Sequence, residues 1–298
     1  MHDHLHRGTT IRKHLWWAFW INFIFFIIEL FGGIYSNSLA LLSDAGHMFT
    51  DVMALGLAIF VSKIGEKLAN AKWTYGYMRA EVIGAFVNGA TLVFICGFIL
   101  IEAVERFGTS QNILGGPMLM IAISGLFANG ISAWILSKDH QDNMNIKGAY
   151  LHLLADTLGS VGAIISGLAI WLWNFTIIDI IASIFIVVLI LIGTKSLLEQ
   201  SVKLLMDTVP EHLDYNTIKE SILKLEHIEQ VHDLHIWSIS QNKPSLSAHL
   251  KLCSECTETH HWSECLKNTQ SFLAKEYGIK HCTLQIEPMD FIEENHCG

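Results

Sequence analysis

Two pairs of histidine and aspartate recur with the same spacing in apolar parts of this sequence. His47 and Asp51 lie in the stretch SLALLSDAGHMFTDVMALGLA, and His152 and Asp156 lie in AYLHLLADTLGSVGAI. A separation of four residues places both side chains of a pair on one face of a helix. Ionisable side chains at membrane depth are costly and mark functional sites. Together the pairs supply two imidazoles and two carboxylates, a full ligand set for a tetrahedral zinc ion.

A zinc ion held by all four groups has no open coordination position. Catalytic zinc keeps three protein ligands and an open position for water, and the sequence contains no HExxH motif. These features argue against a metallohydrolase and favour reversible binding of an ion that crosses the membrane. Two interpretations remain: a zinc exporter, and a membrane metal sensor or receptor whose metal site controls a cytoplasmic domain without net transport.

The helices that must hold these residues are visible as apolar runs. Hydrophobic residues make up 51% of the 298 positions and charged residues 16%, and the mean hydropathy of +0.40 is too apolar for an ordinary soluble domain. Six runs are long enough to cross a hydrocarbon core, near residues 15–35, 39–62, 82–104, 113–136, 149–173 and 176–198. From Glu199 onward, charged and alternating patterns predict a separate domain.

Lysine and arginine residues set the expected orientation. They are concentrated in the N-terminal arm and in the joints after the second and fourth runs, whereas Arg106 is alone on the other side. The positive-inside rule then places both termini in the cytoplasm, in the inner (plasma) membrane of the cell. No signal peptide is expected, because the first apolar run is long and follows a polar arm. The expected domains are an arm at 1–14, a transmembrane domain at 15–204 and a cytoplasmic domain at 205–298.

The pattern of residues 205–298 predicts the order helix, strand, strand, helix, strand. Residues 199–298 contain 8 Lys/Arg and 16 Asp/Glu, a balance of −8, which argues against nucleic acid as a partner and suits cations. In this domain His232, His249, His261 and Glu287 are candidates for secondary, regulatory metal sites. The alternative is that these are surface side chains that bind no metal.

Several segments together resemble a known family. IELFGGIYSNSLALLSDAGHMFTDVMALGLA, with WTYGYMRAEVIGAFVN, LHLLADTLGSVGAI and the terminal HCTLQIEP, closely resembles the cation diffusion facilitator family, in its bacterial zinc-exporting branch. The resemblance implies a polytopic α-helical membrane protein with six transmembrane helices, followed by a cytoplasmic ferredoxin-like α+β domain. It also implies a homodimer that exchanges Zn2+, and potentially Co2+ or Cd2+, for protons.

The same resemblance assigns roles to residues. It makes His47, Asp51, His152 and Asp156 the transport site, and it places a charge interlock at Arg79 and Asp207; a solvated surface pair is the alternative for these last two. It implies no enzymatic activity and no cofactor besides the transported ion.

Other polar residues in the apolar runs each have more than one explanation. Glu29 in the first run and Asn88 in the third either line the ion path or tie helices together. Asp44 either attracts the ion or relays protons, or it bonds backbone at a helix start. Asp179 is predicted to contact a helix N-terminus, where a negative charge is favourable.

The six cysteines of this cytoplasm-facing protein are expected to be reduced thiols rather than disulfides. Cys253 and Cys256 form a single CxxC, which by itself is weak evidence for metal, so a structural or incidental role is favoured. The arm MHDHLH either collects zinc through its imidazoles or is a disordered terminus.

Overall fold

The structure, a computed structural model, describes residues 3–65, 70–109, 111–136, 144–240, 243–253 and 261–288. The side chains of residues 3–15, 17–18, 58–59, 61–65, 128–136 and 144–155 lie outside this description. The chain divides into two compact units: the first comprises Met1–Glu66 and Gly84–Leu198, and the second comprises Lys67–Ile83 and Glu199–Gly298. Each unit is described by itself.

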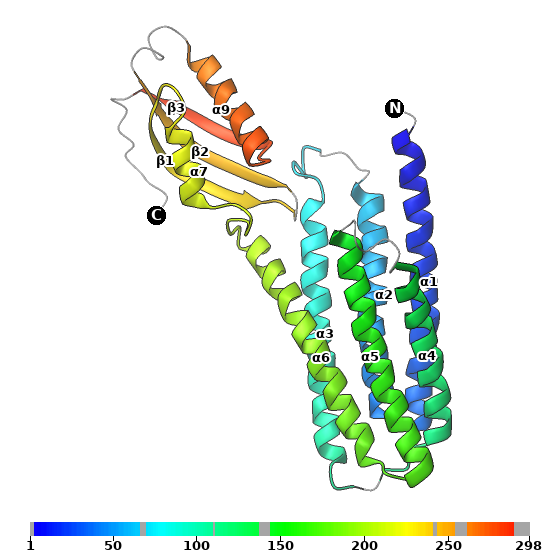
Figure 1. Cartoon of the computed structure of the whole chain (residues 1–298). Helices are drawn as coiled ribbons and strands as arrows, with labels where there is room; N and C mark the ends of the chain where they lie inside the picture. The colour runs from blue at the N-terminus through cyan, green and yellow to red at the C-terminus, as the bar shows by residue number, and fades with distance from the viewer. Residues whose placement is uncertain are drawn as a thin grey trace. The chain divides into compact units, whose positions relative to one another are not determined.

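Long helices build the first unit (Figure 1). They are α1 (Asp3–Ser36), α2 (Leu39–Gly65), α3 (Met78–Arg106), α4 (Gly115–Leu136), α5 (Met144–Trp173) and α6 (Ile177–Leu205). The first residues of α3 and the last residues of α6 belong to the second unit. Each overlaps one apolar run of the sequence, although α1 begins at Asp3 and so includes most of the arm expected at 1–14. Within the described residues, four stretches are long and apolar enough to cross a membrane: Phe19–Ser36, Met78–Arg106, Asp156–Trp173 and Ile177–Leu205.

Small residues allow the helices to approach closely. Contacts join α1 to α2 and α4, and α5 to α2 and α4. Ala122 and Ala163 are almost fully buried between them, as are the larger Ile186 and Val187 of α6. Small side chains bring helix backbones close together inside a membrane, where packing rather than water exclusion drives association. Large apolar side chains such as Phe94 and Ile192 remain exposed on the outside, as expected of a surface that faces lipid.

The start of α2 is held by a carboxylate from another helix. Ser38 caps α2, because its Oγ accepts a hydrogen bond from the Leu41 N–H at 3.2 Å. Asp179 of α6 accepts hydrogen bonds from Ser38 Oγ at 2.7 Å, from the Leu39 N–H at 2.6 Å and from the Ala40 N–H at 3.3 Å. Asp179 therefore does contact a helix N-terminus, and the helix is α2 rather than its own. The contact fixes the beginning of the helix that carries His47 and Asp51.

Within its described residues, the second unit contains a three-stranded sheet together with α7 and α9 (Figure 1). Its elements are α7 (Tyr215–Leu223), β1 (Ile228–Ser238), β2 (Pro244–Leu252), α9 (Trp262–Glu276) and β3 (His281–Glu287). The strand order is β1-β2-β3, with β1 antiparallel to β2 and β2 parallel to β3. The order helix, strand, strand, helix, strand is the one that the sequence pattern predicts.

One face of this sheet forms the core and the other carries polar side chains. Ile222 of α7 and Leu273 of α9 are fully buried with Leu246 and Leu250 of β2. Because successive side chains of a strand point to opposite faces, His249 lies on the face opposite Leu250. The pairing of β2 with β3 brings Glu287 to the same polar face. This face carries the second candidate site.

Candidate metal centre

Three of the four predicted transport ligands converge between α2 and α5. The Nδ1 atom of His47 lies 3.5 Å from Asp51 Oδ2 and 3.5 Å from Asp156 Oδ1. Their ligand atoms all lie within 4.8 Å of one another. Two neighbouring N and O ligands of a tetrahedral zinc ion are separated by about 3.3 Å, given metal–ligand bonds of roughly 2.0–2.1 Å. The arrangement therefore approximates the separation that a shared ion requires.

The position of His47 opposite Asp156 follows from helix direction. Since α2 and α5 are expected to run in opposite directions through the membrane, the histidine of one pair lies level with the aspartate of the other. The His152 backbone belongs to α5, one turn before Asp156, but its side chain lies outside the described residues. Its part in the site remains a prediction from the sequence.

The three groups line a cavity of about 340 Å3 that is bounded by α2, α3, α5 and α6. The side chains of His47, Asp51 and Asp156 are only 17%, 22% and 9% exposed, so an ion among them would lose most of its hydration shell. Within the described residues the Asn88 side-chain oxygen is buried without a hydrogen-bond partner, and it lines the same cavity. Asn88 thus lines the cavity that holds the three groups.

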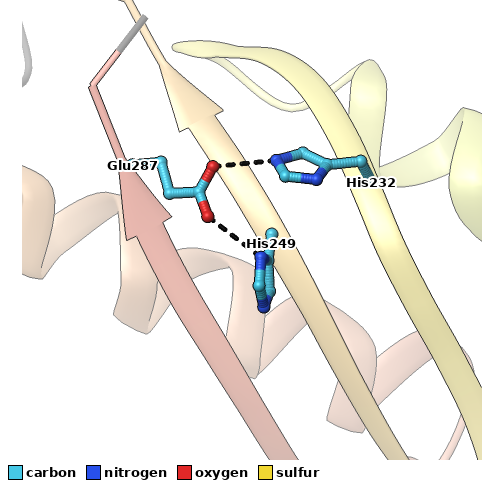
Figure 2. Close-up of side chains that lie close together, drawn as sticks. All are labelled: His232, His249 and Glu287. Carbon is cyan, nitrogen blue, oxygen red and sulfur yellow. Dashed lines mark hydrogen bonds and ion pairs between the residues drawn. The ribbon is translucent and has the colours of Figure 1, made fainter. Parts of the chain in front are cut away.

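A second cluster of metal-ligating side chains lies on the polar face of the sheet (Figure 2). Glu287 Oε2 is 2.8 Å from His232 Nε2, and Glu287 Oε1 is 2.9 Å from His249 Nδ1. The rings of His232 and His249, which are paired across β1 and β2, are 5.2 Å apart. Glu287 is only 2% exposed. These short distances are hydrogen-bond or ion-pair distances, so the carboxylate here holds two imidazoles side by side.

Asp233 adds a carboxylate that the sequence reasoning missed. Its Oδ2 lies 3.5 Å from His249 Nε2, and its Oδ1 lies 3.0 Å from His235 Nε2. Asp233 has a positive φ of 45° and sits where the β1–β2 register shifts between His232 and His235. An irregularity of this kind redirects a side chain, and it therefore gives the cluster a carboxylate on each side of His249. The sequence HDLH, in which Asp233 follows one histidine and precedes another, could have indicated this carboxylate.

The comparisons with known proteins agree with this architecture. Residues 15–206 match the cation efflux transmembrane domain, and residues 210–289 match the cytoplasmic domain of cation efflux proteins. The chain belongs to the cation efflux family. It is therefore a membrane transporter of cations with a transmembrane and a cytoplasmic domain, and it is not an enzyme.

Several relatives cover nearly the full chain. Zinc transporter ZitB of Pectobacterium atrosepticum is 37% identical over 100% of this chain and 92% of its own. The cadmium, cobalt and zinc/H(+)-K(+) antiporter of Bacillus subtilis is 38% identical over 95% of this chain and 91% of its own. Metal cation efflux system protein CzcD of Cupriavidus metallidurans is 35% identical over 96% and 89%.

Two further carboxylates lie near the candidate transport site of this cation efflux protein. Asp44 is 5% exposed, lines the same cavity and accepts a hydrogen bond from Ser160 Oγ at 3.4 Å. The described contact of Asp44 is thus with α5, whereas Asp179 is the carboxylate that binds the backbone at the start of α2. Glu29 is 1% exposed, and neither of its oxygens has a hydrogen-bond partner within the described residues. A methyl group at Gly125 would collide with Glu29 Oε1, so the glycine leaves room for this carboxyl group.

The remaining predicted site residues lie elsewhere in the second unit. His261 is not part of the cluster of His232, His249 and Glu287; it precedes α9 and lines a different cavity. Arg79, in the first turn of α3, donates a hydrogen bond to Asp207, just after α6, at 2.5 Å. Their side chains are 44% and 47% exposed. Exposed ion pairs of this kind are worth at most about 1 kcal/mol, so this pair contributes little to the stability of the fold.

Proposed function

We propose that this protein exports Zn2+ from the cytoplasm, with Co2+ and Cd2+ as further substrates, in exchange for protons. The proposed transport site is the tetrahedral set of His47, Asp51, His152 and Asp156. The observation that carries the proposal is the convergence of one imidazole and two carboxylates, from two helices, on one cavity. Relatives named as transporters of zinc, or of cadmium, cobalt and zinc, support the choice of ions.

The coupling to protons follows from the ligand chemistry. Zinc binds the neutral imidazole and the ionised carboxylate, so metal and protons compete for the same atoms. Because imidazole ordinarily titrates near pH 6.5, an acidic outer side favours protonation and release of the metal, and the cytoplasmic side favours rebinding. Asp44, buried in the same cavity wall, is proposed to relay protons rather than to ligate the ion. Rocking of helices around a fixed site completes the cycle.

The proposed architecture extends the described helices to six membrane spans with both termini in the cytoplasm of the inner (plasma) membrane. The sheet with α7 and α9 on its apolar face is proposed to be the ferredoxin-like domain through which two copies form a homodimer. The ion pair of Arg79 and Asp207 is proposed to act as a charge interlock. The lysine and arginine distribution and the match to the family's cytoplasmic domain support this arrangement.

An imposed pH gradient tests the exchange. In inverted vesicles whose interior is acidic, we expect zinc uptake to be faster than in vesicles without a gradient, because the vesicle interior corresponds to the outer side of the membrane. The measurement is uptake of radioactive zinc, before and after a protonophore abolishes the gradient. Equal zinc uptake with and without the pH gradient would contradict the antiport. Zinc binding without any uptake would instead support a membrane metal sensor.

The cluster of His232, His249 and Glu287 is proposed to be a regulatory metal site. In a full-length protein that also carries Asp156→Ala, we expect Glu287→Gln to weaken zinc binding to the cytoplasmic domain by at least about tenfold, because even outer-shell changes cost about 10–100-fold in metal affinity. Isothermal titration in detergent measures this. Glu229→Gln, an exposed acid on β1, is the matched control and should leave the affinity unchanged. Equal affinities in the two variants would exclude Glu287 as a ligand.

A further inference from the structure

A cysteine and a histidine meet at one end of the sheet, away from the cluster just described. His227 directly precedes β1 and Cys253 directly follows β2. The antiparallel pair Ile228 and Leu252 brings these two positions together, and the Cys253 N–H donates a hydrogen bond to the His227 carbonyl oxygen at 3.1 Å. The juxtaposition is therefore built into the strand register.

The side chains of this pair have the separation of two ligands on one metal ion. Cys253 Sγ lies 3.5 Å from His227 Nδ1. With bonds to zinc of about 2.3 Å from sulfur and about 2.0–2.1 Å from nitrogen, a tetrahedral ion would hold these atoms about 3.6 Å apart. A weak thiol hydrogen bond has a similar length, so the surrounding groups decide between the two.

Two more groups of the type that bind zinc line the cavity beside His227. This cavity, of about 380 Å3, is lined by His227, His261 and Glu264, among others. His261 occupies the N-cap position of α9, but its side chain makes no capping hydrogen bond. Glu264 lies in the first turn of the same helix. Rotation of the His261 and Glu264 side chains toward Cys253 and His227 would complete a set of four ligands.

The backbone holds His227 in an unusual conformation. Its φ of 71° lies in the left-handed region, which is uncommon for a residue other than glycine. Such strain persists when the surrounding structure imposes it and is concentrated at functional sites. Here it accompanies the hydrogen bond from Cys253, so the imidazole is held beside the thiol.

We propose that Cys253 and His227, completed by His261 and Glu264, form a second metal site in the cytoplasmic domain, for a thiophilic divalent ion such as Zn2+ or Cd2+. The site shares no ligand with His232, His249 and Glu287. A thiolate is a soft ligand, so this site favours Cd2+ and Zn2+ over hard divalent ions. Binding converts the Cys253 thiol to a metal-bound thiolate and releases its proton to solvent.

Metal-protected alkylation tests this site in the full-length, reduced protein in detergent. N-ethylmaleimide labelling of Cys253 is followed by peptide mass spectrometry, with and without CdCl2. We expect Cd2+ to slow the labelling of Cys253 by at least about tenfold, since metal coordination removes the free thiolate that reacts. Cys282, half-buried on β3 and outside this cavity, provides the internal reference, and its labelling rate should not change.

Variants identify the partner of the thiol. His227→Gln should raise the Cd2+ concentration needed for half-protection by at least about tenfold, whereas the exposed His212→Gln should not change it. Unchanged protection in His227→Gln, or no protection of the wild-type Cys253, would overturn the proposal. Asp156→Ala should keep full protection of Cys253, so failure of this site and failure of the transport site are distinguishable. Equal thermal unfolding midpoints for the His227 and His212 variants would show that both remain folded.

Discussion

Zinc flux should fall to background when Asp156 is replaced by alanine. The side chain is one of the three described groups that converge on the cavity, 3.5 Å from His47 Nδ1, and it is the described ligand that α5 contributes. Mutation of a residue that only supports a metal ligand costs about 10–100-fold in metal affinity. Loss of a charged ligand itself should therefore reduce transport by more than about 100-fold. The measurement is the initial rate of zinc uptake into proteoliposomes at a fixed zinc concentration.

The control is a carboxylate of the same unit that does not face the cavity. Glu105→Gln removes an exposed acid near the end of α3 and should transport at the wild-type rate. Asp156→Asn is a second test, because it keeps the size of the side chain and removes its charge, and it should also be inactive. If Asp156→Ala retained more than about a tenth of wild-type flux while binding zinc normally, another set of residues would have to carry the ion.

The convergence of His47, Asp51 and Asp156 was predictable, because these residues recur with helical spacing in apolar runs where charged side chains are costly. Charged residues in apolar runs are rare, and a spacing of four residues places both on one helix face. The sequence therefore predicted His47 and Asp51 as partners of a second pair, and helix direction predicted which group would lie opposite which. The same reasoning left Asn88 with two explanations, because helical spacing alone does not tell which face of α3 meets the cavity.

Contacts between distant segments were harder to predict. Asp179 was expected to contact a helix N-terminus, but its partner, α2, begins 140 residues earlier than Asp179. Only the hydrogen bonds in the structure identify that partner. Asp233 was missed because its orientation depends on a register shift in β1. The pairing of His227 with Cys253 likewise depends on strand register. Glu287 and His249 were predictable, because alternation along the strands places both on the face opposite the core.

Replacing Asp179 by asparagine should destabilise the transmembrane unit more than the other changes considered. Hydrogen bonds to a charged group contribute about 1.5–3 kcal/mol each, and a buried donor left without a partner costs about 1–3 kcal/mol. Asp179 is completely buried and accepts from Ser38, Leu39 and Ala40. An asparagine keeps one accepting oxygen and turns an amide toward backbone donors, so we expect a loss of about 2–4 kcal/mol. Thermal unfolding in detergent, followed by tryptophan fluorescence, measures it.

The graded control is Ser38→Ala, which removes one of these hydrogen bonds and leaves Asp179 with its two backbone donors. It should cost about 1 kcal/mol, the usual value of a helix cap. Because α2 carries His47 and Asp51, fraying of its first turns should also lower zinc flux in Asp179→Asn, while zinc added during unfolding should restore part of the lost stability. An unfolding midpoint equal to that of the wild type would show that α2 is held by packing alone and that the carboxylate is dispensable. If Asp179→Asn lowered the unfolding midpoint but left zinc flux normal, the start of α2 would affect stability without affecting the geometry of the metal ligands. These ligands lie two and three turns further along the helix.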